Sequence, residues 1–254
     1  MNTIARTSGS PFPRAVVYGI AFLGIVLAWE ALALAAFRGS SIFPGPLEVF
    51  HALAVEMSWD ALLRDCAISL SRVAVGASVA IGLGIPLGLA CSAFPRAAEF
   101  VTAVIEFFRP IPPIAWIPLA ILWFGIGEMP SYFIIFLAAF FPVFTNSFSG
   151  GHSISRVHRD VARSLLLNRR QYLKHVLLPT ALPQIMAGIQ VGLGIAWMAV
   201  IASEMVASQE GLGYLIQLNR PLLMSDRVIA GMVLIGVIGF LMNRASVWVG
   251  HLLT

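Results

Sequence analysis

The chain has 254 residues and a formal net charge of +4; 59% of the residues are hydrophobic, 11% are charged, and the mean hydropathy is +0.88. Soluble domains carry about 25% charged residues, so the composition excludes an ordinary soluble protein. A hydrocarbon core about 30 Å thick needs about 20 apolar residues in a helix, so the long apolar stretches predict an all-α integral membrane protein and not a barrel.

The N-terminal tail, residues 1–14, is polar and basic, and we expect it in the cytoplasm. The apolar stretch at about 15–36 lacks a small-residue cleavage site, so we interpret it as a retained first span and not as a signal peptide. We expect residues 15–254 to form one transmembrane domain. Hydropathy windows predict its other spans at about 67–92, 99–124, 131–150, 184–206 and 228–251.

Two ionisable residues lie within the second and fifth spans. A charge at the centre of a bilayer costs about 2.5–3.5 kcal/mol on insertion scales, so Arg72 and Glu204 are candidates for the transport pathway or its gate. Arg72 is suited to attract an oxyanion; the alternative is an interhelical pair with a carboxylate such as Glu204. The same spans contain glycines four residues apart, which favour close helix approach. These glycines are Gly84, Gly88, Gly188 and Gly192.

The third span is irregular, because "RPIPPIAWIP" at 109–118 places prolines where a helix would lose its amide donors. In lipid, broken backbone persists where it is buried in protein or lines a cavity. The candidate pathway residues here are Arg109, Pro112, Pro113 and Trp116. The alternatives are a plain kink and, for Arg109, a side chain that reaches the cytoplasmic interface. Asn146 in the fourth span is a further pathway candidate, or a polar residue that holds helices together.

The loop at about 152–183 concentrates the positive charge. From His152 to His175 it has six Arg and Lys residues against Asp160, a net +5 in a chain of +4. From Asp160 to Leu178, apolar residues recur at helical spacing between the arginines, which predicts an amphipathic helix. We expect Pro179 and Pro183 to break the path before the fifth span. A helix, a sharp bend at these prolines and a second short helix would form a rigid structure on the cytoplasmic face, which suits the docking of a partner. A loop that only enforces topology is the alternative.

The distribution of Lys and Arg also predicts the orientation. With the N-terminus inside, the inside segments carry ten of these residues and the outside segments four, so both termini are expected in the cytoplasm. The connection between the fifth and sixth spans then lies outside, with a short helix predicted at 214–219. The histidines show no metal-ligand spacing, and we expect neither a metal site nor a nucleic-acid partner.

Three segments resemble a known family. "ARSLLLNRRQYLKHVLLPTALPQIMAGIQVGLGIAW" at 162–197 is similar to the cytoplasmic EAA loop of binding-protein-dependent ABC importer permeases. "RPIPPIAWIPLAILWFGIGE" at 109–128 and "SEMVASQEGLGYLI" at 203–216 resemble blocks of the nitrate, sulfonate, taurine and bicarbonate branch, with taurine and sulfonate permeases nearest. The resemblance implies a six-helix type I importer subunit with a cytoplasmic coupling helix, in a bacterial inner membrane.

The resemblance also implies partners and a solute. The partners are two ABC ATPase subunits, a second permease copy, an extracytoplasmic solute-binding protein and membrane lipid, and the solute is small and polar or anionic. The chain has no phosphate loop, so ATP and Mg²⁺ are expected on the ATPases, and the chain is not itself an enzyme. The residues implied in coupling are Ala162, Arg163, Leu165, Leu166, Asn168, Arg169 and Pro179.

Leu166 departs from the family pattern, which has glycine at this position of the loop. Because glycine permits positive φ, its absence predicts either a more continuous helix or a changed contact with the ATPase. Two other functions remain open from the sequence. An ion-coupled carrier usually has paired broken helices, whereas one span is strongly broken here. A membrane scaffold that transports nothing is the second.

Overall fold

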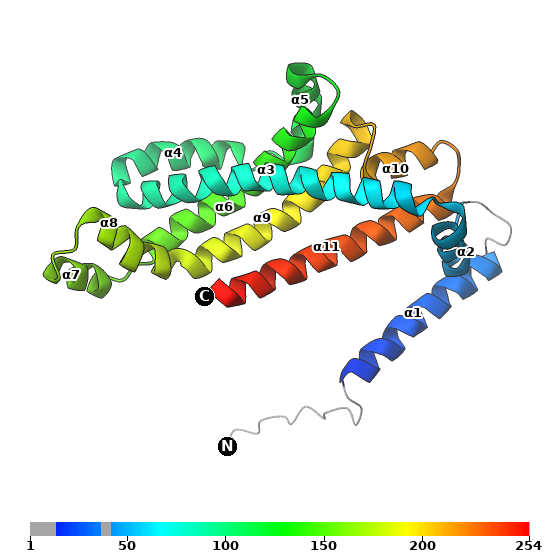
Figure 1. The fold of residues 1–254 in the computed structure, drawn as a ribbon, viewed down its shortest axis with the longest axis horizontal. Coiled ribbons are helices and arrows are strands. Elements are labelled where there is room, and N and C mark those ends of the chain that lie inside the picture. Colours follow the sequence, from blue (N-terminus) through cyan, green and yellow to red (C-terminus); the bar gives the residue numbers. More distant parts are fainter. Residues whose placement is uncertain (1–13, 37–41, 254) are drawn as a thin grey trace. The chain divides into compact units, whose positions relative to one another are not determined.

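The structure, a computed structural model, describes residues 14–36 and 42–253, so the tail at 1–13 lies outside it. The described residues form helices and turns (Figure 1). Five helices are long and apolar enough to cross a membrane, and a bent helix pair makes a sixth span when it is counted as one. These features confirm the predicted all-α membrane fold with six spans.

The chain divides into two compact units, which are described separately. The first comprises residues up to Met57 together with Asn219–Ala230. It contains α1 (Arg14–Ala36), the short helix α2 (Pro46–His51), a π-helical turn, η1 (Ala52–Glu56), and the start of α11 (Ser225–Leu253). Helix α1 matches the predicted first span, whereas α2 and η1 are not predicted by hydropathy, because they are too short to register in a span-length window.

Glu30 connects α1 to α2 within the first unit. The amide of Leu47 donates to Glu30 Oε2 at 3.4 Å, and the indole of Trp29 donates to the Pro44 carbonyl at 3.1 Å. A carboxylate near the N-terminus of a helix is favoured by the partial positive charge of that end. An ionisable residue in a predicted span therefore has a structural partner in the neighbouring helix.

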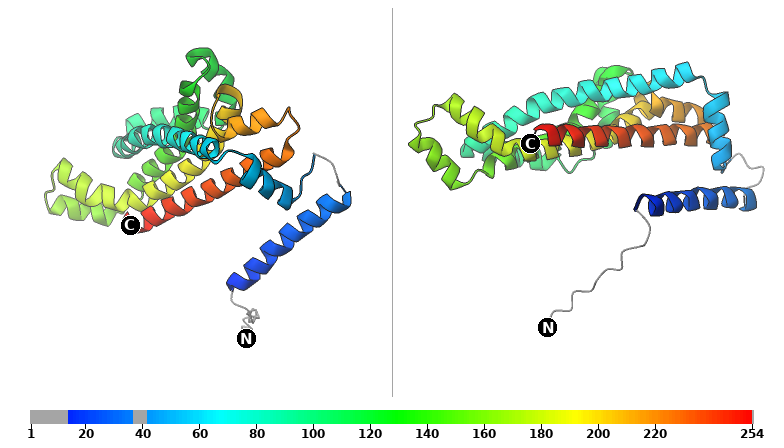
Figure 2. Two further views of the ribbon diagram at one scale, coloured as in Figure 1. Left: turned by 45° about the vertical axis from the view of Figure 1, so that its right-hand side comes forward. Right: turned by 60° about the horizontal axis from the view of Figure 1, so that its bottom comes forward.

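The second unit comprises Ser58–Leu218 and Gly231–Thr254. Its centre consists of α3 (Trp59–Ala93), α6 (Glu128–His152) and α9 (Leu178–Ala207), which lie side by side in Figures 1 and 2. Helix α3 begins before the predicted boundary at 67 because its first turns carry charged residues, which lower hydropathy without preventing a helix. The core between these helices is built from small and β-branched side chains such as Ala80, Ile134 and Val200.

The glycine pairs lie where these helices cross α6. A Cβ on Gly88 of α3 would lie 2.7 Å from the Phe144 carbonyl oxygen and 2.8 Å from Ser147 Cβ. A Cβ on Gly188 of α9 would lie 2.6 Å from Asn146 Cβ. The predicted close approach is therefore confirmed, and it needs glycine because the neighbouring atoms include backbone.

The predicted third span is broken as the prolines indicate. Helix α4 (Pro95–Phe108) is followed by the 3₁₀ turn η2 (Pro113–Trp116) and by α5 (Ile117–Phe124). The two halves are bent by 83°, and α5 turns away from α3 in Figure 1. Consecutive prolines cannot supply the amide donors of a continuous helix, so the chain changes direction at this point.

Two predictions for the basic loop are wrong. The amphipathic helix does not run from Asp160 to Leu178, because α7 (Arg156–Ser164) ends before Leu165 and α8 (Arg169–Tyr172) begins after a turn. Nor do Pro179 and Pro183 break the chain, since helical structure continues from α8 through the π-helical segment η3 (Leu173–Leu177) into α9. Pro179 lies in the first turn of α9, where proline loses no hydrogen bond, and the π-helical segment changes the hydrogen-bond register just before it. Pro183 lies inside α9, and the helix continues through it.

The last two helices agree with the sequence. Helix α10 (Leu212–Asn219) contains the predicted short helix, and α11 contains the predicted sixth span. Within the second unit, the indole of Trp197 on α9 donates to the Ile235 carbonyl of α11 at 3.1 Å. Gly239 lies against the same indole, where a Cβ would be 2.8 Å from its nitrogen. Trp197 is therefore a packing residue between α9 and α11.

Candidate functional site

The basic loop turns sharply at Leu166. The amide of Leu166 donates to the Arg163 carbonyl at 2.9 Å, and the amide of Leu167 donates to the Ala162 carbonyl at 3.2 Å. This is the hydrogen-bond pattern of a Schellman motif, which ends a helix with one residue in the left-handed conformation. Leu166 is that residue, with φ 49°. The expected alternative of a more continuous helix is thus wrong: the turn is present without glycine.

The left-handed conformation has a cost for leucine. Its Cβ approaches the following carbonyl oxygen, which destabilises the conformation by about 1–2 kcal/mol relative to the right-handed one. Glycine has no such penalty. Because the side chain of Leu166 is 89% exposed, packing within the chain offsets little of this cost.

Apolar side chains gather on the outer side of this turn. Val157, Val161 and Leu165 follow one another at intervals of four residues, and all are exposed, as is Leu166. We call these four residues the apolar ridge. In contrast, Ala162 and Ile154 are buried against the rest of the second unit. Ala162 belongs to α7 and Ile154 lies just before it, so the chain covers α7 on the side of Ala162 and leaves the side of the apolar ridge uncovered.

The chain after the turn is held by a reciprocal cap. The amide of Gln171 donates to Asn168 Oδ1 at 2.9 Å, and the amide of Asn168 donates to Gln171 Oε1 at 2.9 Å. This capping box starts α8. Arg163 is exposed and lies 3.7 Å from Asp160, while the side chain of Arg169 lies outside the described residues. Pro179 is in the first turn of α9 and not in the turn with Leu166.

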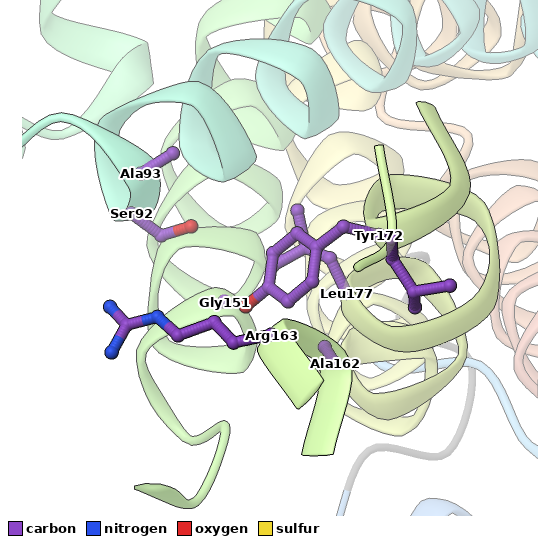
Figure 3. A pocket seen from close by; sticks show the side chains of 8 residues that line it. Ser92, Ala93, Gly151, Ala162, Arg163, Tyr172 and Leu177 are labelled. Atoms are coloured by element: carbon purple, nitrogen blue, oxygen red, sulfur yellow. The ribbon is translucent and has the colours of Figure 1, made fainter. Parts of the chain in front are cut away.

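A cleft of about 500 Å³ lies behind the turn. Figure 3 shows the side chains of Ser92, Arg163 and Tyr172 around it, contributed by α3, α7 and α8. Leu167 lines the same cleft, whereas the preceding residue, Leu166, is exposed on the outer side of the turn. The turn therefore contacts the rest of the second unit on its inner side, and its outer side is uncovered.

A polar cluster around Arg72 of α3 and Glu204 of α9 is a second candidate region. It lies toward the ends of these two helices that are away from the basic loop. Arg72 and Glu204 are fully buried, and Arg72 Nη1 donates to Glu204 Oε1 at 2.8 Å. Arg72 also pairs with Glu128 at the start of α6, through Nη2 to Oε1 and through Nε to Oε2 at 2.7 Å. The structure thus brings together the ion pair that the sequence offers as one of two alternatives.

The same cluster holds the segment before α10. Three consecutive amides are bound: Gly211 donates to Asp65 Oδ1 at 3.0 Å, Leu212 to Ser69 Oγ at 3.0 Å and Gly213 to Glu204 Oε2 at 2.9 Å. Ser69 Oγ in turn donates to Glu204 at 2.8 Å. Gly211 has φ 108°, a conformation that side chains rarely adopt. The first turn of α10 is therefore attached to α3 and α9.

Sequence reasoning missed three members of this cluster: Asp65, Ser69 and Glu128. A signal for two of them exists, because Asp65, Ser69 and Arg72 are spaced by four and three residues and so share one face of α3. The donors of Arg72 face the chain's own acceptors, including the Glu210 carbonyl at 2.8 Å. This geometry favours a structural role for Arg72 over direct contact with a solute.

The other candidate pathway residues lie elsewhere. Asn146 donates to the Pro142 carbonyl of its own helix at 2.9 Å and lies against Gly188. Trp116 packs on Phe108, with ring centroids 6.0 Å apart, and its buried Nε1 has no hydrogen-bond partner among the described residues. Arg109 is exposed at the end of α4, and Pro112 and Pro113 flank the start of η2. These residues do not form one site with Arg72 and Glu204 in the described part of the chain.

Comparison with solved structures shows the fold. The membrane subunit of the MetNI methionine ABC transporter, in an inward-facing conformation, superposes with a TM-score of 0.67, covering 78% of this chain and all of that chain at 20% identity. The fold is that of an ABC importer membrane subunit. The family model for the binding-protein-dependent transport system inner membrane component matches residues 80–253. The chain belongs to this family.

Relatives of similar length agree with this assignment. The taurine transport system permease protein TauC of Escherichia coli is 35% identical, over 92% of this chain and 87% of that protein. A putative ABC transporter permease of Methanocaldococcus jannaschii is 38% identical, over 86% and 84%. The nitrate import permease protein NrtB of Synechocystis is 29% identical, over 91% and 86%. These matches span most of both chains.

Proposed function

We propose that this chain is the permease subunit of an ATP-driven importer that moves a small oxyanion-bearing solute into the cytoplasm. The family match over residues 80–253 carries this proposal. Relatives named for taurine, aliphatic sulfonates, nitrate and bicarbonate support the class of solute, since each of these carries an oxyanion group. Two copies of the chain form the pathway in the inner membrane, with both termini in the cytoplasm, and a solute-binding protein delivers the solute.

The apolar ridge docks on the ATPase subunit, which holds ATP and Mg²⁺. Two observations support this step. Helical structure runs from Arg170 to Ala207, 38 residues. At 1.5 Å per residue its length is about 57 Å, almost twice the hydrocarbon core, so the turn projects beyond the lipid. Exposed apolar residues outside a membrane mark an interaction surface, and the basic residues around them favour an acidic partner.

The polar cluster around Arg72 transmits the movement. It joins α3, α6, α9 and the first turn of α10, so these elements move as one body when the ATPases close and displace α7. Rigid-body rocking of packed helices is an established way to alternate access. The polar cluster acts as a fixed attachment at the outer end, because the Arg72–Glu204 ion pair and the hydrogen bond from the Gly213 amide to Glu204 are buried.

Reconstitution tests the proposed function. The permease, its ATPase and its binding protein are placed in liposomes, and uptake of labelled taurine, nitrate and bicarbonate is measured with ATP on the ATPase side. We expect ATP-dependent uptake of one of these solutes and none without the ATPase. Uptake driven by an ion gradient in the absence of ATPase would identify a secondary carrier. Failure to bind any ATPase in a ratio near one to one would favour a scaffold.

A charge on the apolar ridge should prevent docking. We expect Val161→Asp to weaken ATPase binding at least about tenfold, because an isolated carboxylate is costly in an apolar interface and 1.4 kcal/mol corresponds to a factor of ten. Binding is measured with purified permease and ATPase in detergent.

The control is Leu222→Asp, which puts the same charge at an exposed leucine in the connection between α10 and α11. This connection is expected on the other side of the membrane, so ATPase binding should be unchanged. Equal effects of the two substitutions would contradict the docking surface.

A further inference from the structure

Two leucines adopt a conformation that glycine usually provides. Among the described residues, Leu166 and Leu223 are the non-glycine residues with positive φ, at 49° and 57°. Both occupy the same position of a Schellman motif: Leu223 donates to the Arg220 carbonyl at 3.2 Å, and Met224 donates to the Asn219 carbonyl at 3.3 Å. Glycine would form both turns without steric strain. The chain therefore offers a matched pair of strained leucines.

The fold gives no reason for a leucine at position 166. Its side chain is 89% exposed, compared with 67% for Leu223, so it contributes little to the core. Backbone strain that the fold does not need is often associated with function. A large apolar side chain therefore occupies a position where glycine would make the chain more stable.

The position of Leu166 suggests what it contacts. It follows Val157, Val161 and Leu165 and extends the apolar ridge past the end of α7. The left-handed turn leaves the side chain of Leu166 exposed, while the next residue, Leu167, lines the cleft on the inner side of the turn. Exposed Arg163 and Arg170 lie nearby in the sequence. The ridge therefore ends in an apolar projection among positive charges.

We infer that Leu166 is a specificity-determining contact, whose side chain enters an apolar recess with an acidic rim on the ATPase subunit. This inference rests on the proposed docking of the ridge on the ATPase. An ATPase without the recess would leave the leucine exposed or in a steric clash, and would bind more weakly. Burying one leucine changes affinity about tenfold or more, which is enough to discriminate between related partners.

Three substitutions separate the contact from the strain. Leu166→Gly removes the side chain and the strain, Leu166→Ala removes the side chain and keeps most of the strain, and Leu223→Gly removes the same strain elsewhere. Each full-length permease is purified in lipid nanodiscs and in detergent. The dissociation constant for the ATPase and the midpoint of thermal unfolding are measured for each.

We expect both substitutions at position 166 to weaken ATPase binding about tenfold, in nanodiscs and in detergent alike. Leu166→Gly should raise the unfolding midpoint, and Leu166→Ala should not. Leu223→Gly should raise the midpoint with unchanged ATPase binding. The affinity for the ATPase would then depend on the side chain at position 166, and the unfolding midpoint would depend on the backbone strain.

Two results would overturn the inference. One is that Leu166→Gly and Leu166→Ala bind the ATPase as tightly as the unmodified permease, while Val161→Asp binds it more weakly. The docking surface would then stand, but Leu166 would not belong to it. The other is a loss of affinity in nanodiscs that is absent in detergent, which would assign Leu166 to the lipid surface. If the unmodified permease binds no ATPase at all, the proposed function itself fails, so the two failures are distinguishable.

Discussion

Replacing Arg72 by methionine is expected to destabilise the permease by about 3–5 kcal/mol. The substitution leaves the carboxylate of Glu204 fully buried beside a side chain of similar length that has no charge. Removing one member of a buried ion pair is costly because the remaining charge has neither water nor an opposite charge, and Glu204 would keep only its hydrogen bonds from Ser69 and Gly213. Unfolding in a denaturing detergent, followed by helix content, measures the loss, and ATP-driven uptake should fall with it.

Two controls make this prediction specific. Arg64 also lies on α3 and pairs with a carboxylate, Glu210, but both side chains are exposed. Exposed pairs contribute about 0–1 kcal/mol, so Arg64→Met should have a small effect. The double substitution Arg72→Met with Glu204→Met should be less damaging than Arg72→Met alone, since no buried charge is left. If Arg72→Met costs no more than Arg64→Met, the network does not hold the outer end together.

Replacing Gly88 by alanine should separate α3 from α6. The new methyl group would lie 2.7 Å from the Phe144 carbonyl oxygen and 2.9 Å from the Phe148 amide nitrogen, and backbone atoms cannot move aside as a flexible side chain can. Overpacking of this kind costs about 1–3 kcal/mol. Lower unfolding stability and reduced ATP-driven uptake are the expected measurements.

Gly82 is the matched control for Gly88 because it lies on the same helix. A Cβ on Gly82 meets nothing within 4 Å, so Gly82→Ala should be neutral or stabilise α3 by up to about 1 kcal/mol through helix propensity. Opposite signs for the two substitutions would confirm that packing, and not helix propensity, requires glycine at position 88. A loss of stability with both would contradict this explanation.

Several parts of the fold follow from local sequence because their causes are local. Span positions depend on runs of apolar residues, and the break in the third span depends on prolines that remove amide donors within a few residues. Local reasoning was wrong at Pro179 and Pro183, where the same rule predicts a break. There a π-helical segment, Leu173–Leu177, changes the hydrogen-bond register before the prolines, and the positions of the prolines do not predict this segment.

The two candidate functional regions differ in how much the sequence reveals. Charge density and apolar spacing indicate the basic loop as a docking element, but the helix was expected to continue past Leu166. The turn forms because the carbonyls of Ala162 and Arg163 accept the following amides, and these hydrogen bonds compensate the unfavourable φ of a leucine. Residue preferences alone favour a continuous helix here, since leucine is a strong helix former.

Contiguous residues were enough to predict a helical membrane protein, the approximate positions of its spans and the family that its motifs resemble, because apolar length and short motifs are local properties. The partners of Arg72, in contrast, became known from the packing of the helices. Its partners Glu128 and Glu204 are 56 and 132 residues away, and the pairing depends on how three helices are rotated about their axes. Hydropathy is insensitive to that rotation, so the partner of a buried charge becomes visible only when the helices are packed.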